Sequence, residues 1–105
     1  MKFVNRGYML VSPKKAFIDW ANENDEDFSD LVDNEASVYL IEEDFYDDEP
    51  VVKANFKKIF INELSAVSGD ESSFPDINME NFNKYFEVTL GTSVFDAQTG
   101  GLQAD

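Results

Sequence analysis

The feature that most constrains the fold is a long amphipathic segment at residues 49–67. Its apolar side chains recur at helical spacing: Val52, Phe56, Ile59, Phe60, Leu64 and Val67. Asp48, Glu49 and Pro50 are typical of a first helical turn, and the Ser68-Gly69-Asp70 run ends the pattern. We therefore expect the longest helix of the chain at residues 49–67, with one apolar side packed against other elements.

Three further segments predict strands. Residues 3–11 are rich in aromatic and branched side chains, although Asn5-Arg6-Gly7 interrupts them. The continuous apolar run at residues 38–41 is typical of a strand covered on both faces, so we expect it at the centre of the sheet. Residues 86–94 alternate apolar with polar side chains, which predicts a strand with one face in water.

Two shorter helices are expected. Ser12 as N-cap and Pro13 at the first helical position predict a helix over residues 13–24. Its apolar stripe is narrow: Phe17, Trp20, Ala21 and Asn24. A second short helix should be capped by Asn78, with one face formed by Met79, Phe82 and Phe86.

These segments together predict an α+β fold in a single domain over residues 1–96, with residues 97–105 as a flexible C-terminal tail. The expected order is strand-helix-strand-helix-helix-strand, giving a three-stranded sheet with about three helices. A chain of 105 residues with 43% apolar side chains can build one core. The aromatic content of 14% excludes the disordered class despite the charge.

The charge is strongly segregated. The net charge is −14, and residues 19–49 contain fourteen acids and no base, whereas the rest of the chain holds eight of each. Such a field repels nucleic acids and anionic membrane surfaces, so neither is an expected partner. It favours cationic partners, and a basic protein is the partner we expect.

The residues that are missing exclude several kinds of chemistry. The chain has no cysteine and no histidine, which removes disulfides, thiolate sites, the usual neutral-pH proton shuttle and the commonest nitrogen metal ligand. No phosphate-binding glycine loop is present either. We expect no enzyme, no catalytic residue, no metal and no cofactor. Without a signal peptide or a long apolar stretch, we expect a soluble cytoplasmic protein.

The stretch after the predicted central strand is the candidate binding segment. It combines carboxylates with two rings: Glu42, Glu43, Asp44, Phe45, Tyr46 and Asp47. The rings would be apolar anchors for a partner, provided that they are not buried in the domain's own core. These carboxylates could instead chelate Ca²⁺ or Mg²⁺ weakly, or be a solvated loop at the start of a helix. An EF-hand alignment beginning at Asp25 fails at two decisive positions, Asp30 and Ala36.

Two smaller features involve the basic residues. Lys14 and Lys15 lie at the start of the predicted first helix, where they could bind an anion or where Lys15 could simply pair with Asp19. Arg6 is the only arginine, and Glu63 falls within the apolar face of the long helix. A partly buried Arg6–Glu63 ion pair is one interpretation, and a Glu63 that reaches water is the other.

Four segments, RGYMLVSPKKAFIDW, SVYLI, FKKIFINEL and FEVTLGTSVFD, resemble a group of small uncharacterised bacterial proteins. The resemblance rests on apolar framework residues together with Arg6-Gly7, Pro13-Lys14, Trp20 and Asp96. It implies a compact bacterial cytosolic domain and no catalytic residue.

These observations predict a non-enzymatic interaction protein whose acidic region binds a basic protein surface, as an immunity protein, a toxin inhibitor or a nucleic-acid mimic would. The alternative is a small-ligand-binding or divalent-cation-binding domain that uses the carboxylates after the central strand.

Overall fold

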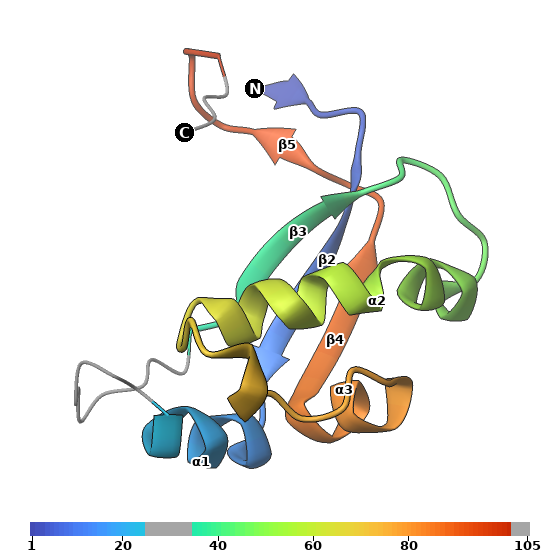
Figure 1. The fold of residues 1–105 in the computed structure, drawn as a ribbon. Helices are drawn as coiled ribbons and strands as arrows, with labels where there is room; N and C mark the ends of the chain where they lie inside the picture. Colours follow the sequence, from blue (N-terminus) through green and yellow to red (C-terminus); the bar gives the residue numbers. More distant parts are fainter. Residues whose placement is uncertain (25–34, 102–105) are drawn as a thin grey trace.

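The computed structural model describes residues 1–24 and 35–101. They form an α+β fold in which a three-stranded antiparallel sheet packs against helices, next to a small two-stranded sheet (Figure 1). The elements are β1 (Lys2–Phe3), β2 (Gly7–Pro13), α1 (Lys15–Asn24), β3 (Ser37–Ile41), α2 (Asp48–Ser65), a 3₁₀ turn (Glu71–Ser73), α3 (Met79–Tyr85), β4 (Phe86–Gly91) and β5 (Phe95–Asp96). The predicted fold class and the order of the main elements are confirmed.

The strand order of the larger sheet is β3-β2-β4. The central strand is therefore β2, and the prediction that residues 38–41 form the centre is wrong. A continuous apolar run predicts cover on both faces, but Val38 and Leu40 are 62% and 51% exposed. Only Ile41 of β3 is buried. β3 is therefore an edge strand, and the side chains on its face away from the core are apolar but exposed.

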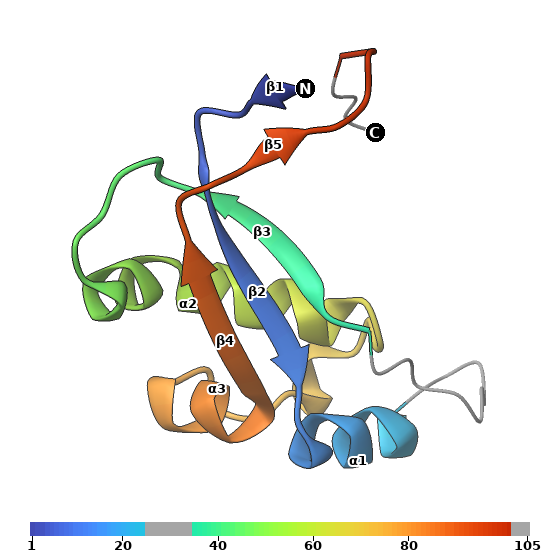
Figure 2. The same cartoon turned by 180° about the vertical axis from the view of Figure 1, so that it is seen from behind.

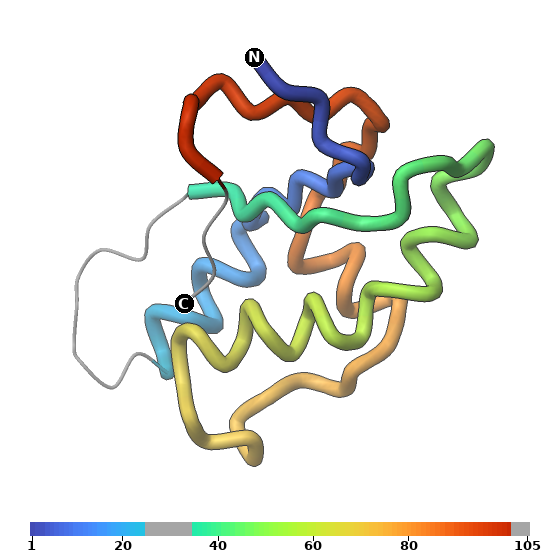
Figure 3. Tube along the Cα trace, turned by 90° about the horizontal axis from the view of Figure 1, so that it is seen from above, coloured from blue at the N-terminus to red at the C-terminus, as the bar shows by residue number. Residues whose placement is uncertain are grey.

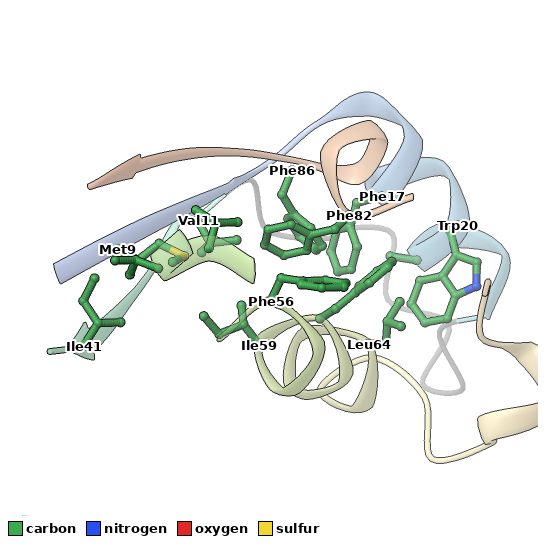
Figure 4. Packing of buried hydrophobic residues seen from close by; sticks show 14 residues of the cluster. Met9, Val11, Phe17, Trp20, Ile41, Phe56, Ile59, Leu64, Phe82 and Phe86 are labelled. Atoms are coloured by element: carbon green, nitrogen blue, oxygen red, sulfur yellow. The ribbon is translucent and has the colours of Figure 1, made fainter. Parts of the chain in front are cut away.

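One face of the sheet carries the core. α2 crosses this face, and α1 and α3 lie at one end of it (Figure 1). The buried aromatic side chains pack closely around Phe60, whose ring centroid lies 5.7 Å from Phe82 and 5.8 Å from Phe86. Figure 4 shows the neighbouring side chains of Phe56, Phe82 and Phe86 in this core. Met9 and Val11 of β2 are fully buried and close the sheet side of this core. Burial of such rings is the main source of stability for a domain of this size.

The other face of the sheet has no helix over it in the described residues (Figure 2). Cross-strand pairs on this face join Leu10 with Val38 and Tyr8 with Leu40. On the β4 side, Tyr8 lies opposite Gly91, and its ring occupies the space that a side chain at position 91 would need. Helices of the described residues thus cover one side of the sheet.

The first helix begins at Lys15, so the prediction of a helix start at Ser12-Pro13 is wrong. Both residues still belong to β2 and lie opposite Glu87 and Phe86 of β4. Val11 is the last residue of β2 that pairs with β3, so Pro13 pairs with β4 alone. A proline is tolerated at such a strand end. The predicted apolar side of this helix is confirmed.

The two-stranded sheet was not predicted. β1 and β5 pair antiparallel, and the rings of Phe3 and Phe95 meet edge to face with centroids 5.7 Å apart. This ribbon lies at the end of the larger sheet that is opposite α1 (Figure 1). The pairing of β1 with β5 places residues from near the two ends of the described chain side by side.

Candidate functional site

The candidate site is the acidic loop, defined as residues 42–47, which joins β3 to α2. It projects at the outer side of the molecule (Figure 3). Its four carboxylate residues are exposed. Tyr46 is fully exposed, whereas Phe45 is half-buried and packs against the core. Of the two proposed anchors, the structure leaves only Tyr46 available to a partner.

The loop is anchored at its first residue. The Gly7 N–H donates to the Glu42 carbonyl oxygen at 3.1 Å. The Asn55 side chain, which is buried in α2, donates both to the Glu42 carboxylate at 3.1 Å and to the Val51 carbonyl at 2.8 Å. Glu42 is thus tied to both β2 and α2, and its charge is held near the sheet edge.

Gly7 makes this anchoring possible. A Cβ at this position would lie 2.7 Å from the Glu42 carbonyl oxygen and 3.0 Å from the Phe45 ring. The first distance is shorter than real Cβ atoms show and the second is tight, so a side chain at this position would push the loop away from β2. The Arg6-Gly7 interruption that weakened the strand prediction is therefore the place where the loop docks.

The loop leads directly into α2. Asp47 occupies the N-cap position with extended backbone angles, but its side chain makes no capping hydrogen bond. Asp48 and Glu49 lie in the first turn. Negative charge is favourable there because the helix dipole is positive at its N-terminus. These two acids are explained by helix stability, whereas the side chains of Glu43, Asp44 and Asp47 make no hydrogen bond or ion pair among the described residues.

Two hollows flank the first turn of α2. The larger, of about 870 Å³, is open and is lined by Tyr46, Asp47, Asp48, Glu49, Pro50 and Lys53. The smaller, of about 360 Å³, is lined by Asp48, Glu49, Val52, Lys53, Met79, Asn83, Val88 and Leu90. Its apolar floor and acidic rim match a lysine or arginine side chain, which has an aliphatic stem and a charged end. The ion pair of Lys53 with Glu49, at 3.2 Å, is exposed and contributes little to stability.

A second polar cluster joins β3 to α2. The Tyr39 hydroxyl donates to the Glu63 carboxylate, which also accepts a hydrogen bond from the Ser37 hydroxyl at 3.2 Å. Asn62 donates to the Tyr39 oxygen at 2.9 Å. Burial, and then the hydrogen bond to Glu63, raise the pKa of Tyr39 well above its ordinary value of 10.0. Tyr39 therefore stays protonated near neutral pH and serves as a structural donor.

The predicted Arg6–Glu63 pair is wrong. Arg6 donates to the neighbouring Asn5 carbonyl at 2.7 Å, and Glu63 is held by the two hydroxyls of β3. The register explains the difference, because Gly7 lies opposite Ile41 at one end of β3 and Ser37 lies at the other end. At about 3.3 Å per residue, Arg6 and Glu63 are separated by most of the strand.

The two lysines of the possible anion site each contact a neighbouring group of the protein. The Lys14 side chain donates to the Asn83 carbonyl at 2.8 Å, and its backbone N–H donates to the Tyr85 carbonyl at 2.8 Å. Lys15 pairs with Asp19 at 2.8 Å, one turn along α1, which is the simpler of the two sequence interpretations. Both lysine side chains and the Lys14 N–H already have partners within the protein.

No group of three or more acidic side chains gathers into a metal-binding arrangement in residues 1–24 and 35–101. Of the acidic-loop carboxylates, that of Glu42 accepts a hydrogen bond from Asn55, and the other three belong to exposed residues. Most of the EF-hand-like alignment, which begins at Asp25, lies outside the described residues. In the part of the chain that the structure describes, none of the helices has both the length and the apolar character needed to cross a bilayer.

Comparisons with protein-family models, with curated proteins and with solved structures gave no match. The resemblance seen in the framework segments therefore stays a prediction.

Proposed function

We propose that this chain is a non-enzymatic binding protein that recognises a basic surface of another protein through the acidic loop. The observation that carries the proposal is Tyr46, a fully exposed ring held between exposed carboxylates on an anchored loop. An exposed tyrosine within a charged surface is typical of the residues that dominate binding energy at interfaces.

Phe45 supports this arrangement from the inside. Its ring packs against the core and against the backbone at Gly7, so that the next residue is presented outward. A loop fixed at Glu42 and Phe45 loses less conformational entropy on binding than a loose acidic segment would. Tyr46 can then bury its ring against a partner at a small entropic cost.

The charges define the class of partner. Exposed carboxylates at residues 43, 44 and 47 are followed along the chain by those of the first turn of α2. Such negative charge accelerates association with cationic proteins and opposes nucleic acids. The adjoining hollow of about 360 Å³ offers an apolar floor for the stem of a lysine or arginine. An immunity, inhibitor or mimic role fits this surface.

The proposal is tested by neutralising charge without changing shape. The triple variant Glu43→Gln, Asp44→Asn, Asp47→Asn removes three charges that support no folded contact among the described residues. The matched control removes three exposed charges elsewhere: Glu71→Gln, Asp76→Asn and Glu87→Gln. Binding of oligolysine, measured by calorimetry at about 50 mM salt, should weaken about tenfold or more in the loop variant and less than about threefold in the control.

Tyr46→Ala removes the exposed ring but no charge, so it separates the contribution of the ring from that of the carboxylates. We expect this variant to keep the stability of the wild type and the salt dependence of its binding, while losing about 1–2 kcal/mol of affinity for a basic partner. Equal loss of affinity in the loop and control triple variants would show that only the net charge matters, and would refute a specific site at the acidic loop.

A further inference from the structure

One edge of β3 has no strand beside it in residues 1–24 and 35–101. Within the described residues its strand neighbour is β2 alone. In an antiparallel strand, alternate residues direct their N–H and C=O groups to opposite edges. Half of the backbone groups of β3 therefore point away from the sheet, where another extended chain could accept and donate the same hydrogen bonds.

This edge lacks the features that usually protect an edge strand. Proteins discourage unwanted pairing with lysine, proline or inward-pointing charge on the exposed strand. The sequence of β3 is SVYLI, with none of these residues. Its exposed side chains are Val38 and Leu40, both apolar and both on the open face of the sheet. β4, at the other edge, carries the exposed Glu87.

A groove runs between this edge and α2. It has a volume of about 320 Å³, and all of its lining residues come from these two elements: Tyr39, Leu40, Ile41, Asn55, Lys58, Ile59 and Asn62. Its walls are fixed by side-chain hydrogen bonds at both ends. Asn55 bonds Glu42 at one end, and Tyr39 bonds Glu63 and Asn62 at the other. The groove is therefore preformed.

We propose that an extended segment of the basic partner adds to the sheet along β3 as a fourth strand. Side chains alternate between the two faces of a strand. One set would enter the groove beside α2, and the other would pack next to Val38 and Leu40 on the open face. The proposal rests on the proposed function, because the acidic loop at the end of β3 attracts the partner and strand addition then defines how it binds.

The charges favour a cationic segment over a second copy of this chain. Exposed acids lie on both sides of β3, with Glu35 before it and Glu42, Glu43 and Asp44 after it. A strand with lysine or arginine at its ends would meet opposite charge at both ends. A second β3 would bring its own acids into this field, and two chains with a net charge of −14 each repel.

The test uses the full chain and the synthetic peptide Lys-Lys-Val-Thr-Val-Thr-Val-Lys-Lys. A second peptide of the same sequence has methyl groups on the backbone nitrogens of all five central residues, so that neither edge can donate hydrogen bonds there while charge and side chains are unchanged. Each lost hydrogen bond weakens binding by about twofold to tenfold, so the methylated peptide should bind about tenfold or more weakly. Amide hydrogen exchange should slow in β3 only with the unmethylated peptide.

Two exposed sites on the same sheet face provide variants with equal charge changes. Leu40→Lys blocks the edge strand and should weaken binding of the unmethylated peptide about tenfold or more, whereas Thr89→Lys on β4 should change it less than about twofold. Both are surface changes that leave the core intact.

The outcomes distinguish this inference from the proposed function. If both peptides bind equally and exchange slows at the acidic loop alone, strand addition is refuted and the proposed function stands. If neither peptide binds at low salt, both are refuted. Protection of β3 that grows with protein concentration in the absence of peptide would show that a second copy occupies the edge, which also refutes the inference.

Discussion

Replacing Gly7 with alanine tests how the acidic loop is held. The added methyl group would lie 2.7 Å from the Glu42 carbonyl oxygen, 3.0 Å from the Gly91 carbonyl oxygen and 3.0 Å from the Phe45 ring. Two of these three neighbours are backbone atoms of strands or of the loop joined to them. They can move only if the loop separates from β2 or if the two strands shift.

The expected cost follows from these contacts. Overpacking by one methyl group at a rigid site costs about 1–3 kcal/mol. Alanine recovers about 0.5–1 kcal/mol because it restricts the unfolded chain more than glycine does. Gly7→Ala should therefore lower the free energy of unfolding by about 1–2 kcal/mol, which corresponds to a fall in Tm of about 4–16 °C for a domain of this size.

Two other glycines make the experiment internally controlled. A Cβ at Gly69 meets no atom within 4 Å, so Gly69→Ala should be neutral or slightly stabilising. At Gly91 the close atoms belong to the outer end of the Tyr8 ring, which can rotate away, so an intermediate loss is expected. Urea unfolding followed by Trp20 fluorescence measures all three. A Gly7→Ala protein as stable as Gly69→Ala would refute the docking of the loop on β2.

The remaining predictions concern local contacts. Tyr39→Phe removes the donor to Glu63 and should cost about 1–2 kcal/mol in urea unfolding, whereas Arg6→Ala should change stability by less than about 0.5 kcal/mol. Burial, and then Glu63, raise the pKa of Tyr39 above 10.0 in the folded state, so the neutral phenol is favoured by folding. The stability that the neutral Tyr39 phenol contributes is complete below pH 10.0 and is lost as the pH rises toward the raised pKa. In denaturation series between about pH 9 and about pH 11, the free energy of unfolding should therefore fall less for Tyr39→Phe than for the wild type. Asn78 accepts a hydrogen bond from the Asn81 N–H at 2.8 Å, so Asn78→Ala should lower stability by about 1 kcal/mol in thermal unfolding.

The elements with strong local signals were predictable. The amphipathic pattern of residues 49–67 corresponds to α2, and Asn78 caps α3 as expected. The alternation that begins at Phe86 corresponds to β4. In each case the signal lies within a few neighbouring residues, where capping and side-chain period act directly.

The errors arose where long-range packing decides. The apolar run of β3 was expected at the centre, but apolar residues do not by themselves show what covers them, and Val38 and Leu40 stay exposed. Ser12-Pro13 has a helix-start signal that pairing with β4 overrides. The contact of Phe3 with Phe95 joins two short segments far apart in the chain, with no local pattern to predict it.

The candidate site was partly predictable. Charge segregation located the acidic loop, and the residue types suggested two anchors. Which ring faces solvent depends on the contact of Phe45 with the backbone at Gly7, and the partners of Glu63 depend on strand register. Neither is visible in sequence spacing.

The central claim is that recognition is concentrated at the acidic loop rather than spread over an acidic surface. The most direct measurement is a residue-by-residue map of backbone NMR shifts when the isotopically labelled full chain is titrated with oligolysine at about 150 mM salt. We expect the largest changes at residues 42–49, with Tyr46 foremost, and smaller changes along β3. Shifts of equal size at the exposed acids Glu71, Asp76 and Glu87 would contradict it.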